Sequence, residues 1–225
     1  MTIGAIVPLP SGVEPAAVFT LVGGEAVLAR LVRAVFAPDR PLVVVAAGSL
    51  ADGARECLDA HGLSAAAVAA APSRGGRRDC VTRGLEYLVR ERVSTSQVLL
   101  HDHRHPLAHE SMTDRVVEGL RTGHSVVVPA VVMTDSVKAV DDRGSVGGTV
   151  DRGGLRIVQF PRGLALRALA ELLAEDDIGG FDELSAAMRA GLPIAVVEGD
   201  AEALRIELPA DADLLAATTV VGRSG

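Results

Sequence analysis

The stretch from Gln97 to Pro106 reads Q-V-L-L-H-D-H-R-H-P, and the rest of the chain is arranged around it. Three apolar residues lead into a polar cluster, and Pro106 ends the run. An apolar strand that opens into polar residues is typical of an α/β sheet, in which ligands bind at the carboxyl ends of parallel strands. The stretch therefore predicts a buried strand at 97–101 that delivers Asp102 to a ligand site.

The composition narrows the class of protein. The chain has 225 residues, which is enough for a single domain over 1–225 with its own core. Hydrophobic residues make up 48% but aromatic residues only 2%, so the core must consist of Ala, Val, Leu and Ile. The formal net charge of -7 argues against a nucleic-acid partner, because phosphate neutralisation needs clustered Lys and Arg.

The two cysteines, Cys57 and Cys80, form no C-x-x-C pair, which indicates neither a disulfide framework nor a zinc site. The first residues lack a basic start followed by a long apolar run, so no signal peptide is predicted. No apolar run approaches the roughly 18 residues that span a bilayer. These features predict a cytoplasmic protein without a membrane partner.

Strands and helices alternate through the first 131 residues. Apolar runs predict strands, and apolar residues at helical spacing predict helices. The predicted strands are 3–7, 42–46, 66–70, 97–101 and 125–131, followed later by 155–160, 194–197 and 204–207. The predicted helices are 25–36, 50–61 with Ser49 as its N-cap, 79–92, 110–122, 164–175, 182–190 and 210–221. The alternation predicts an α/β fold with a mostly parallel sheet and helices on both faces.

The alternation stops at Thr134. The segment Asp135 to Arg152 alternates apolar and polar residues around a D-D-R-G turn, which predicts a protruding β-hairpin arm. Such an arm can pack on a second subunit. The local alternative is a flap over the site.

The polar cluster after the predicted strand at 97–101 has two interpretations. Asp102, just past a buried strand, has the position of a single-carboxylate magnesium ligand; the alternative is a helix N-cap or turn aspartate. His101, His103 and His105 could bind a transition metal. Residues two apart share one direction only on a strand, however, and Pro106 ends the strand, so the alternative is solvated loop histidines.

Two groups of arginines could meet an anion. The first lies in a glycine-rich loop before a helix, where backbone amides attract phosphate or a polar base edge. The second follows the arm, and arginine forks suit phosphate. The members are Arg74, Arg77 and Arg78 in the first group and Arg152, Arg156 and Arg162 in the second. The alternative for each residue is a solvated surface arginine. No G-x-S-x-G elbow or Walker loop supports another chemistry.

Seven stretches match, in order, the motifs of one known family. They are A-I-V-P (5–8), F-T-L-V-G-G-E-A-V-L-A-R (19–30), R-R-D-C-V (77–81), V-L-L-H-D (98–102), T-D-S-V-K (134–138), T-V-D-R-G-G-L (149–155) and D-E-L-S (182–185). The chain resembles the 2-C-methyl-D-erythritol 4-phosphate cytidylyltransferases of the non-mevalonate isoprenoid pathway. The resemblance covers nearly the whole chain, and V-L-L-H-D and T-V-D-R-G-G-L are its most specific pieces.

The resemblance implies a Rossmann-like fold and a homodimer held by the β-arm at about 135–152. It also implies transfer of CMP from CTP, or a related nucleotide, to a phosphorylated sugar alcohol, with release of pyrophosphate. The reaction would use Mg²⁺.

By position, the resemblance also implies roles for individual residues. Asp102 would be catalytic and hold Mg²⁺, and Arg205, where the family has a late lysine, would be the second catalytic residue. The nucleotide would lie against Pro8, Leu9, Ser11, Gly12, Ser73, Gly75, Arg77 and Cys80. The sugar phosphate would lie against Asp135, Thr149 and Arg152, with the arm residues reaching into the partner's site.

The first loop departs from the family pattern. The family reads A-A-G-x-G-x-R followed by P-K, whereas Leu9 to Ala17 reads L-P-S-G-V-E-P-A-A, with Glu14 and Ala17 in the region of the missing cations. His105 also replaces a family arginine, and 160–162 reads F-P-R where the family has T-P-Q. Losing one charge-stabilising donor typically costs about 10²–10³ in rate.

Three functions remain open. The first is a cytidylyltransferase of reduced activity, in which Arg77, Arg104 or Arg205 partly replaces the missing cations. The second is an inactive paralogue that acts as a binding or regulatory protein. The third is a histidine metal site with its own chemistry.

Overall fold

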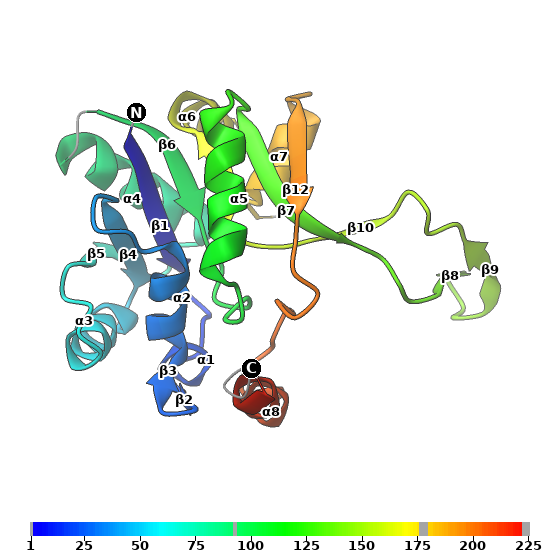
Figure 1. Ribbon diagram of the computed structural model, residues 1–225, viewed down its shortest axis with the longest axis horizontal. Helices are drawn as coiled ribbons and strands as arrows, with labels where there is room; N and C mark the ends of the chain where they lie inside the picture. The colour runs from blue at the N-terminus through cyan, green and yellow to red at the C-terminus, as the bar shows by residue number, and fades with distance from the viewer. Residues whose placement is uncertain (1, 92–93, 176–179, 222–225) are drawn as a thin grey trace.

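A central sheet crosses the molecule, helices cover both of its faces, and a long arm leaves one side (Figure 1). The computed structural model describes residues 2–91, 94–175 and 180–221. In this part of the chain the sheet has eight strands. They are β1 (Thr2–Leu9), β4 (Leu42–Ala47), β5 (Ala67–Ala71), β6 (Thr95–Leu100), β7 (Val126–Val132), β10 (Arg156–Val158), β11 (Arg162–Ala165) and β12 (Ile194–Glu198).

The helices and the two small sheets complete the described elements. The helices are α1 (Pro15–Phe19), α2 (Val27–Val35), α3 (Leu50–Ala60), α4 (Arg77–Glu91), α5 (Glu110–Arg121), α6 (Leu166–Ala174), α7 (Glu183–Arg189) and α8 (Ala212–Val221). The small sheets pair β2 (Leu21–Val22) with β3 (Glu25–Ala26) and β8 (Val137–Val140) with β9 (Val146–Val150).

The strand order is β10-β7-β11-β6-β1-β4-β5, and β12 pairs with β7. Neighbours β6, β1, β4 and β5 run parallel, as does the pair β12 and β7. The exceptions are β10 and β11, which run antiparallel to their neighbours. The predicted α/β class with a mostly parallel sheet and helices on both faces is therefore confirmed.

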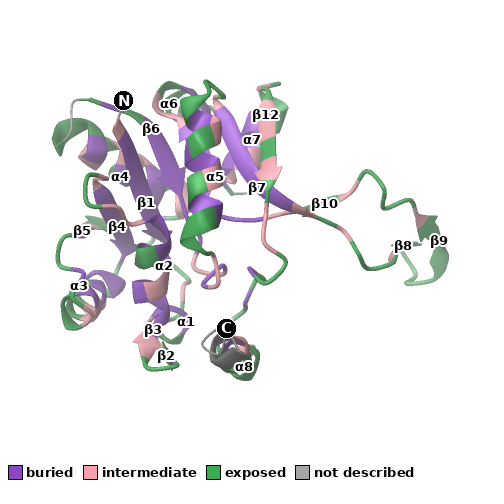
Figure 2. Cartoon of the chain, in the orientation of Figure 1, coloured by how far each residue is buried: buried purple, intermediate pink, exposed green. Residues whose placement is uncertain are grey.

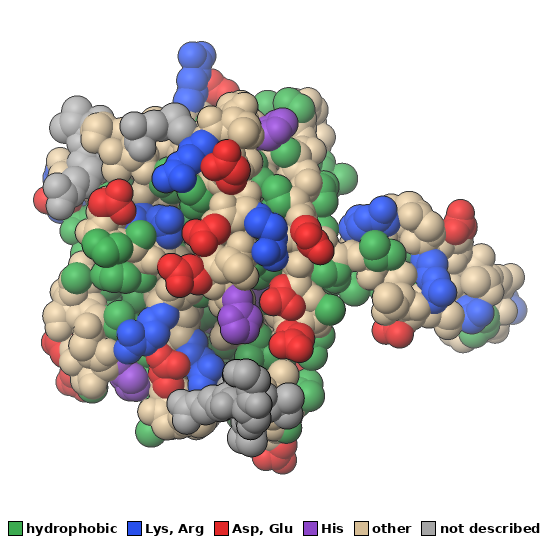
Figure 3. Space-filling view, viewed as in Figure 1, with side chains coloured by type: hydrophobic (Ala, Val, Ile, Leu, Met, Phe, Trp, Pro, Cys, Tyr) green, Lys and Arg blue, Asp and Glu red, His purple; other side chains and the backbone are tan. Residues whose placement is uncertain are grey.

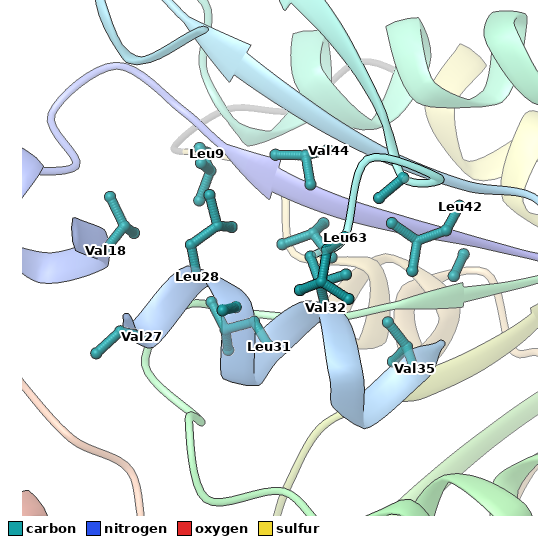
Figure 4. Close-up of a cluster of buried hydrophobic side chains, with 14 of the residues drawn as sticks. Leu9, Val18, Val27, Leu28, Leu31, Val32, Val35, Leu42, Val44 and Leu63 are labelled. Atoms are coloured by element: carbon teal, nitrogen blue, oxygen red, sulfur yellow. The ribbon is translucent and has the colours of Figure 1, made fainter. Parts of the chain in front are cut away.

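Two apolar layers sandwich the sheet. One joins the sheet to α2, α3 and α5, and Figure 4 shows part of it, where Leu28 and Val32 of α2 point at Leu9 of β1 and Val44 of β4. The other joins the opposite face to α4, α6 and α7. Figure 2 shows the central strands buried along their length. A strand that is covered on both faces needs apolar side chains at successive positions, which explains the continuous Val- and Leu-rich runs in the sequence.

Helix α4 packs unusually close to β1 because glycine is present on both elements. A Cβ added at Gly84 would lie 2.6 Å from the side chain of Ile6, and one at Gly4 would lie 2.7 Å from Leu88. Both distances are shorter than real Cβ contacts. The two glycines therefore set the distance between this helix and the central strand.

Most predicted elements are confirmed to within a few residues, with four differences. The segment 204–207 is not a strand, and Ile206 makes one backbone bond, to the carbonyl oxygen of Arg104 at 2.8 Å. The predicted strand 155–160 is limited to β10, and the first part of the predicted helix 164–175 belongs to β11. Ser49 precedes α3, but its side chain makes no capping hydrogen bond. Arg92, the predicted end of the helix at 79–92, lies outside the described residues.

The predicted hairpin arm is confirmed as β8 and β9. Its residues are mostly exposed, and it projects away from the body of its own chain, which is not the arrangement of a flap over its own site (Figures 1 and 2). Figure 3 shows basic and acidic side chains along its visible face. Among the described helices, none is long and apolar enough to cross a membrane.

Candidate functional site

The candidate site lies at the carboxyl end of β6, next to the central strand β1. The backbone N–H of His101 still donates to the carbonyl oxygen of Ile6 at 3.1 Å, so parallel pairing continues to the residue before Asp102. Asp102 follows directly and is only 2% exposed. The polar residues of the opening stretch are therefore placed at a strand end, as the sequence predicts.

Guanidinium groups surround the Asp102 carboxylate. Its Oδ1 accepts from the backbone N–H of Arg104 at 3.0 Å and from Arg104 Nε at 2.9 Å. Its Oδ2 accepts from Arg104 Nη2 at 2.9 Å and from Arg77 Nη1 at 3.3 Å. Burial alone would raise the pKa of Asp102, but the Arg104 hydrogen bonds and the Arg77 charge hold it well below its usual range. Asp102 is therefore an ionised, tightly bound carboxylate.

Glu183 also binds Arg77 and joins one further arginine, Arg162, to this group. It is 1% exposed at the start of α7, and it accepts from Arg77 Nε at 3.0 Å and Arg77 Nη2 at 2.9 Å. Arg162 Nη1 donates to Glu183 at 3.2 Å and to Asp182 at 2.7 Å. Three arginines and three carboxylates thus form one network with no net charge, buried except for the partly exposed Arg104 and Asp182. Asp182 also accepts from the backbone N–H of Ser185 and caps α7.

Phe160 lies under this network. The guanidinium carbons of Arg162 and Arg77 lie 4.1 Å and 5.3 Å from the centre of its ring. Burial would lower the pKa of Arg77, but the neighbouring Glu183 and then Asp102 hold it above its usual value. Arg77 therefore stays charged, and the guanidinium groups of both arginines lie against the aromatic ring of Phe160.

The histidines of the opening stretch do not form a metal cluster. His101 and His105 are buried, and His103 is half-buried with Nδ1 at 3.6 Å from Asp102. Burial lowers the pKa of His101 to about 3 and that of His105 to about 4, so both rings are neutral at neutral pH. Among the described residues, no group of three His, Cys, Asp or Glu side chains could hold a metal ion. Solvated loop histidines, the predicted alternative, are also wrong for these two buried rings.

The contacts of the two buried histidines identify the tautomer of His101 and one nitrogen atom in each ring that has no partner. The backbone N–H of Asp102 donates to His101 Nδ1 at 2.9 Å, so the proton of this neutral ring is on Nε2. That Nε2 and the Nδ1 of His105 are buried without a hydrogen-bond partner in the described part of the chain. His105 lines a pocket, but its unpartnered Nδ1 is itself buried.

The pocket beside Asp102 has a volume of about 500 Å³ and is rich in arginine. Arg104, Arg162 and Arg205 line it together with Asp135, His105 and Phe160. Arg205 also contacts Glu207, and its side chain is exposed. The arrangement suits a ligand with one or more negative groups. Two residues predicted from separate parts of the chain, Asp135 and Arg205, are thus brought to one pocket beside the third, Asp102.

The predicted nucleotide-binding residues are gathered between β1 and α4. The backbone N–H of Ser11 donates to the carbonyl oxygen of Gly75 at 2.8 Å, which joins the first loop to the glycine-rich loop. Arg77 starts α4 and reaches Asp102, and Cys80, one turn later, is buried.

Four other predicted nucleotide-binding residues lie around these. Pro8 and Leu9 end β1, and Leu9 packs in the core, so only its backbone can face a ligand. Gly12 follows with a φ of 94°, which suits glycine, and Ser73 is exposed.

The arm residues lie apart from this group within the chain. Thr149 accepts a hydrogen bond from Lys138 Nζ at 2.8 Å across the arm. Arg152, at the base of the arm, donates to the carbonyl oxygen of Thr134, which borders the pocket. Thr149 is exposed on the projecting hairpin and does not reach its own chain's pocket (Figure 1).

The residues at Asp102 do not fit the predicted magnesium ion as they stand. A carboxylate oxygen offers two lone pairs, and both oxygens of Asp102 accept two donors each. Magnesium requires oxygen ligands at about 2.0–2.1 Å. A metal at Asp102 would have to displace a guanidinium group first.

Sequence reasoning missed the role of Glu183. It matched part of the D-E-L-S motif but had no predicted function, and its partner Arg77 lies 106 residues away. Charges that pair across such a distance leave no local pattern in the sequence. Only the motif match itself could have drawn attention to Glu183.

Comparison with known proteins identifies the family. A family model described as IspD, 2-C-methyl-D-erythritol 4-phosphate cytidylyltransferase, matches residues 12–223. The cytidylyltransferase of that name from Streptomyces coelicolor is 34% identical over 213 residues, which cover 89% of this chain and 76% of that protein. The one from Rhodococcus jostii is 32% identical over 196 residues, 86% of this chain and 82% of that protein.

Larger proteins and solved structures also match. The bifunctional enzyme IspD/IspF of Paracoccus denitrificans is 34% identical over 190 residues, and the match spans 84% of this chain but 47% of that protein. For several curated relatives, therefore, this chain spans about half the length or less. The crystal structure of the cytidylyltransferase from Thermus thermophilus superposes with a TM-score of 0.76 at 26% identity, over 96% of this chain and 98% of that one. The chain belongs to the 2-C-methyl-D-erythritol 4-phosphate cytidylyltransferase family.

Proposed function

We propose that this protein transfers CMP from CTP to a phosphorylated sugar alcohol, 2-C-methyl-D-erythritol 4-phosphate in its named relatives, and releases pyrophosphate. A phosphate oxygen of the acceptor would form a bond to the α-phosphorus of CTP, while the bond from that phosphorus to the pyrophosphate oxygen breaks. The observation that carries the proposal is the arginine-rich pocket beside Asp102, on a sheet of this family's fold.

The chain's own residues suggest how the substrates would bind. The base and ribose of CTP would lie against the joined loops at Ser11 and Gly75, close to Arg77. The acceptor phosphate would enter the pocket and meet Arg104, Arg162 and Arg205. Phosphoryl transfer depends mainly on positioning and charge stabilisation, which fixed guanidinium groups supply. The predicted catalytic role of Arg205 is part of this proposal.

We also propose that the activity is reduced, because the first loop carries no positive charge. The first basic residue in the whole chain is Arg30, and Glu14 is an exposed carboxylate within the loop. The match to the family model begins at residue 12, after β1 and the start of this loop. A triphosphate on this loop would lack a cation there and would be repelled by Glu14.

The second candidate function is an inactive paralogue that binds a ligand or regulates a partner. The observation that favours it is the hydrogen bond from Ser11 to Gly75. A backbone N–H in this loop is a natural phosphate donor, but here the Ser11 N–H is already used. The third prediction, a histidine metal site, is not retained. Among the described residues, His101, His103 and His105 belong to no group of side chains that could hold a metal ion.

Two measurements on the full chain decide between the candidates. Pyrophosphate release is assayed with CTP and methylerythritol phosphate, and CTP binding is measured by calorimetry. Slow release that depends on both substrates and falls in Arg205→Ala supports the enzyme. Binding of either ligand without release supports the inactive paralogue. If CTP binding produces no heat and no pyrophosphate is released at millimolar ligand, both candidate functions are ruled out.

We further propose that two chains form a homodimer through the arm. The arm is exposed and projects from the body, and this geometry would let Thr149 and Arg152 approach a second subunit (Figure 1). Replacing residues 137–150 by a short glycine turn should convert a dimer to a monomer in light scattering. An unchanged mass would contradict this proposal. A cytoplasmic location without nucleic-acid or membrane partners remains a prediction from the sequence.

A further inference from the structure

The side chain of Arg104 holds Asp102 as a fork. Its Nε and Nη2 each lie 2.9 Å from a different oxygen of the carboxylate, and its own backbone N–H adds a third bond at 3.0 Å. A bidentate pair of this kind is both stronger and more directional than a single ionic contact. Arg104 therefore occupies the face of Asp102 that a metal ion would need.

The charges around Asp102 are balanced before any metal is added. Arg77 is fixed from its other side by two bonds to Glu183, and Arg162 is held by Glu183 and Asp182. Arg104 is the remaining cation of this network, and it neutralises Asp102. A divalent ion placed there would lie close to several guanidinium groups, whose repulsion in a buried site is large.

Arg104 also faces the pocket. Its side chain is 37% exposed, and it lines the pocket with Arg162 and Arg205. A guanidinium has five N–H groups, and the described contacts to Asp102 use two of them. The other three can meet a ligand anion while the fork to Asp102 stays in place.

We propose that Arg104 is the resident cation of Asp102 and takes the place of a divalent metal in this chain. Anions in the pocket would then be bound by a protein guanidinium without a metal ion. The inference depends on the proposed function only for the identity of the anion. The occupation of Asp102 can be tested without any catalytic assay.

The test is a titration of the full chain with Mn²⁺ alone. Electron paramagnetic resonance measures the concentration of the free ion at each step. Wild type should show no Mn²⁺ binding that depends on Asp102 up to about 1 mM, the range of a weak protein metal site. Arg104→Ala should bind Mn²⁺ at least about tenfold more tightly, a change of about 1.4 kcal/mol. The double variant Arg104→Ala, Asp102→Asn should lose that binding again.

Arg205→Ala is the matched control, because Arg205 lines the same pocket but contacts Glu207 rather than Asp102. It should leave Mn²⁺ binding at the wild-type level. The proposal is overturned if wild type binds Mn²⁺ as tightly as Arg104→Ala, if Arg104→Ala fails to gain binding, or if Arg205→Ala gains as much.

A second measurement uses only the wild type, in case Arg104→Ala does not fold. Binding of inorganic phosphate is measured by calorimetry with Mg²⁺ and with EDTA. Equal affinity within about twofold supports the resident guanidinium, and a roughly tenfold loss in EDTA, or no phosphate binding at all, contradicts it. Absent pyrophosphate release would remove the proposed function but leave the Mn²⁺ result valid.

Discussion

Two loops leave the sheet side by side, and they differ sharply in charge. The loop after β1, 10–14, has an exposed carboxylate, Glu14, and no basic residue. The loop after β6, 101–105, contains Asp102 and Arg104, which are ionised and bound to each other. The strands are direct neighbours, so both loops border one space. The comparison teaches that this chain concentrates its cationic side chains on the β6 side of the site, where carboxylates pair with them.

The largest expected effect comes from removing the carboxylate that holds the β6 side together. Glu183→Gln leaves Arg77 and Arg162 without their shared buried partner, so the free energy of unfolding should fall by about 3 kcal/mol. Urea denaturation measures it. Glu171→Gln, in an exposed pair with Arg167, is the control and should leave the unfolding midpoint unchanged. Equal effects in both variants would show that the network does not stabilise the β6 side.

The next effect is a pH dependence that only the β6 side should show. The folded pKa values of His101 and His105, about 3 and about 4, lie below the ordinary 6.5. The unfolded chain therefore binds more protons between about pH 6.5 and 4, and stability falls as the pH falls through this window. Each ring contributes a slope approaching about 1.4 kcal/mol per pH unit. Below about pH 4, Asp102 becomes protonated in the unfolded chain but stays ionised in the folded one, because its folded pKa is lowered, and this acts in the same direction.

The slope is measured by urea unfolding at several pH values. His105→Gln should remove the contribution of that ring and leave those of His101 and of His103, whose pKa burial also lowers. His124→Gln, at an exposed position, serves as the control and should keep the full slope. A wild-type stability that is flat from about pH 6.5 to 4 would show that the two rings are not held neutral.

The smallest expected effect tests the β1 side. Glu14→Arg adds a cation to the loop that has none, and CTP affinity should rise about tenfold, since a bond to a charged group is worth about 1.5–3 kcal/mol. Glu14→Gln, which only removes the repulsion, should gain less. Calorimetry with CTP measures both. If neither variant changes the affinity, the nucleotide does not lie on this loop.

The sequence predicts the central parallel strands β1, β4 and β6 well, because strands covered on both faces have continuous apolar runs. The prediction fails at β11, where R-G-L-A continues into a helix-like run. These residues form a strand because they fit between β6 and β7, where their backbone finds partners on both sides. Local propensity cannot reveal a gap in a sheet that is built elsewhere in the chain.

The site was predictable in its parts but not in its connections. Asp102 and Arg205 follow from the position of motifs, and the structure places Arg205 in the pocket next to Asp102's partner Arg104. The occupation of Asp102 by Arg104 does not follow, because H-D-H-R-H-P fixes only the order of the residues. Whether the chain after Asp102 turns back on it depends on the hydrogen bond from the backbone N–H of Arg104 to Asp102 Oδ1 at 3.0 Å, which the order of the residues does not fix.

The close contact between α4 and β1 makes the site sensitive to a single methyl group placed far from it. Gly84 lies seven residues after Arg77 on the same helix, about 10 Å along its axis. A Cβ at Gly84 would need to move from 2.6 Å to an ordinary contact distance from Ile6, a displacement of about 1 Å. If α4 shifts as a rigid rod, Arg77 shifts with it, and a misplacement of that size can cost about 100-fold in rate. The tolerance of the proposed reaction to a misplaced Arg77 would thus be set by Gly84, which packs against Ile6 of β1.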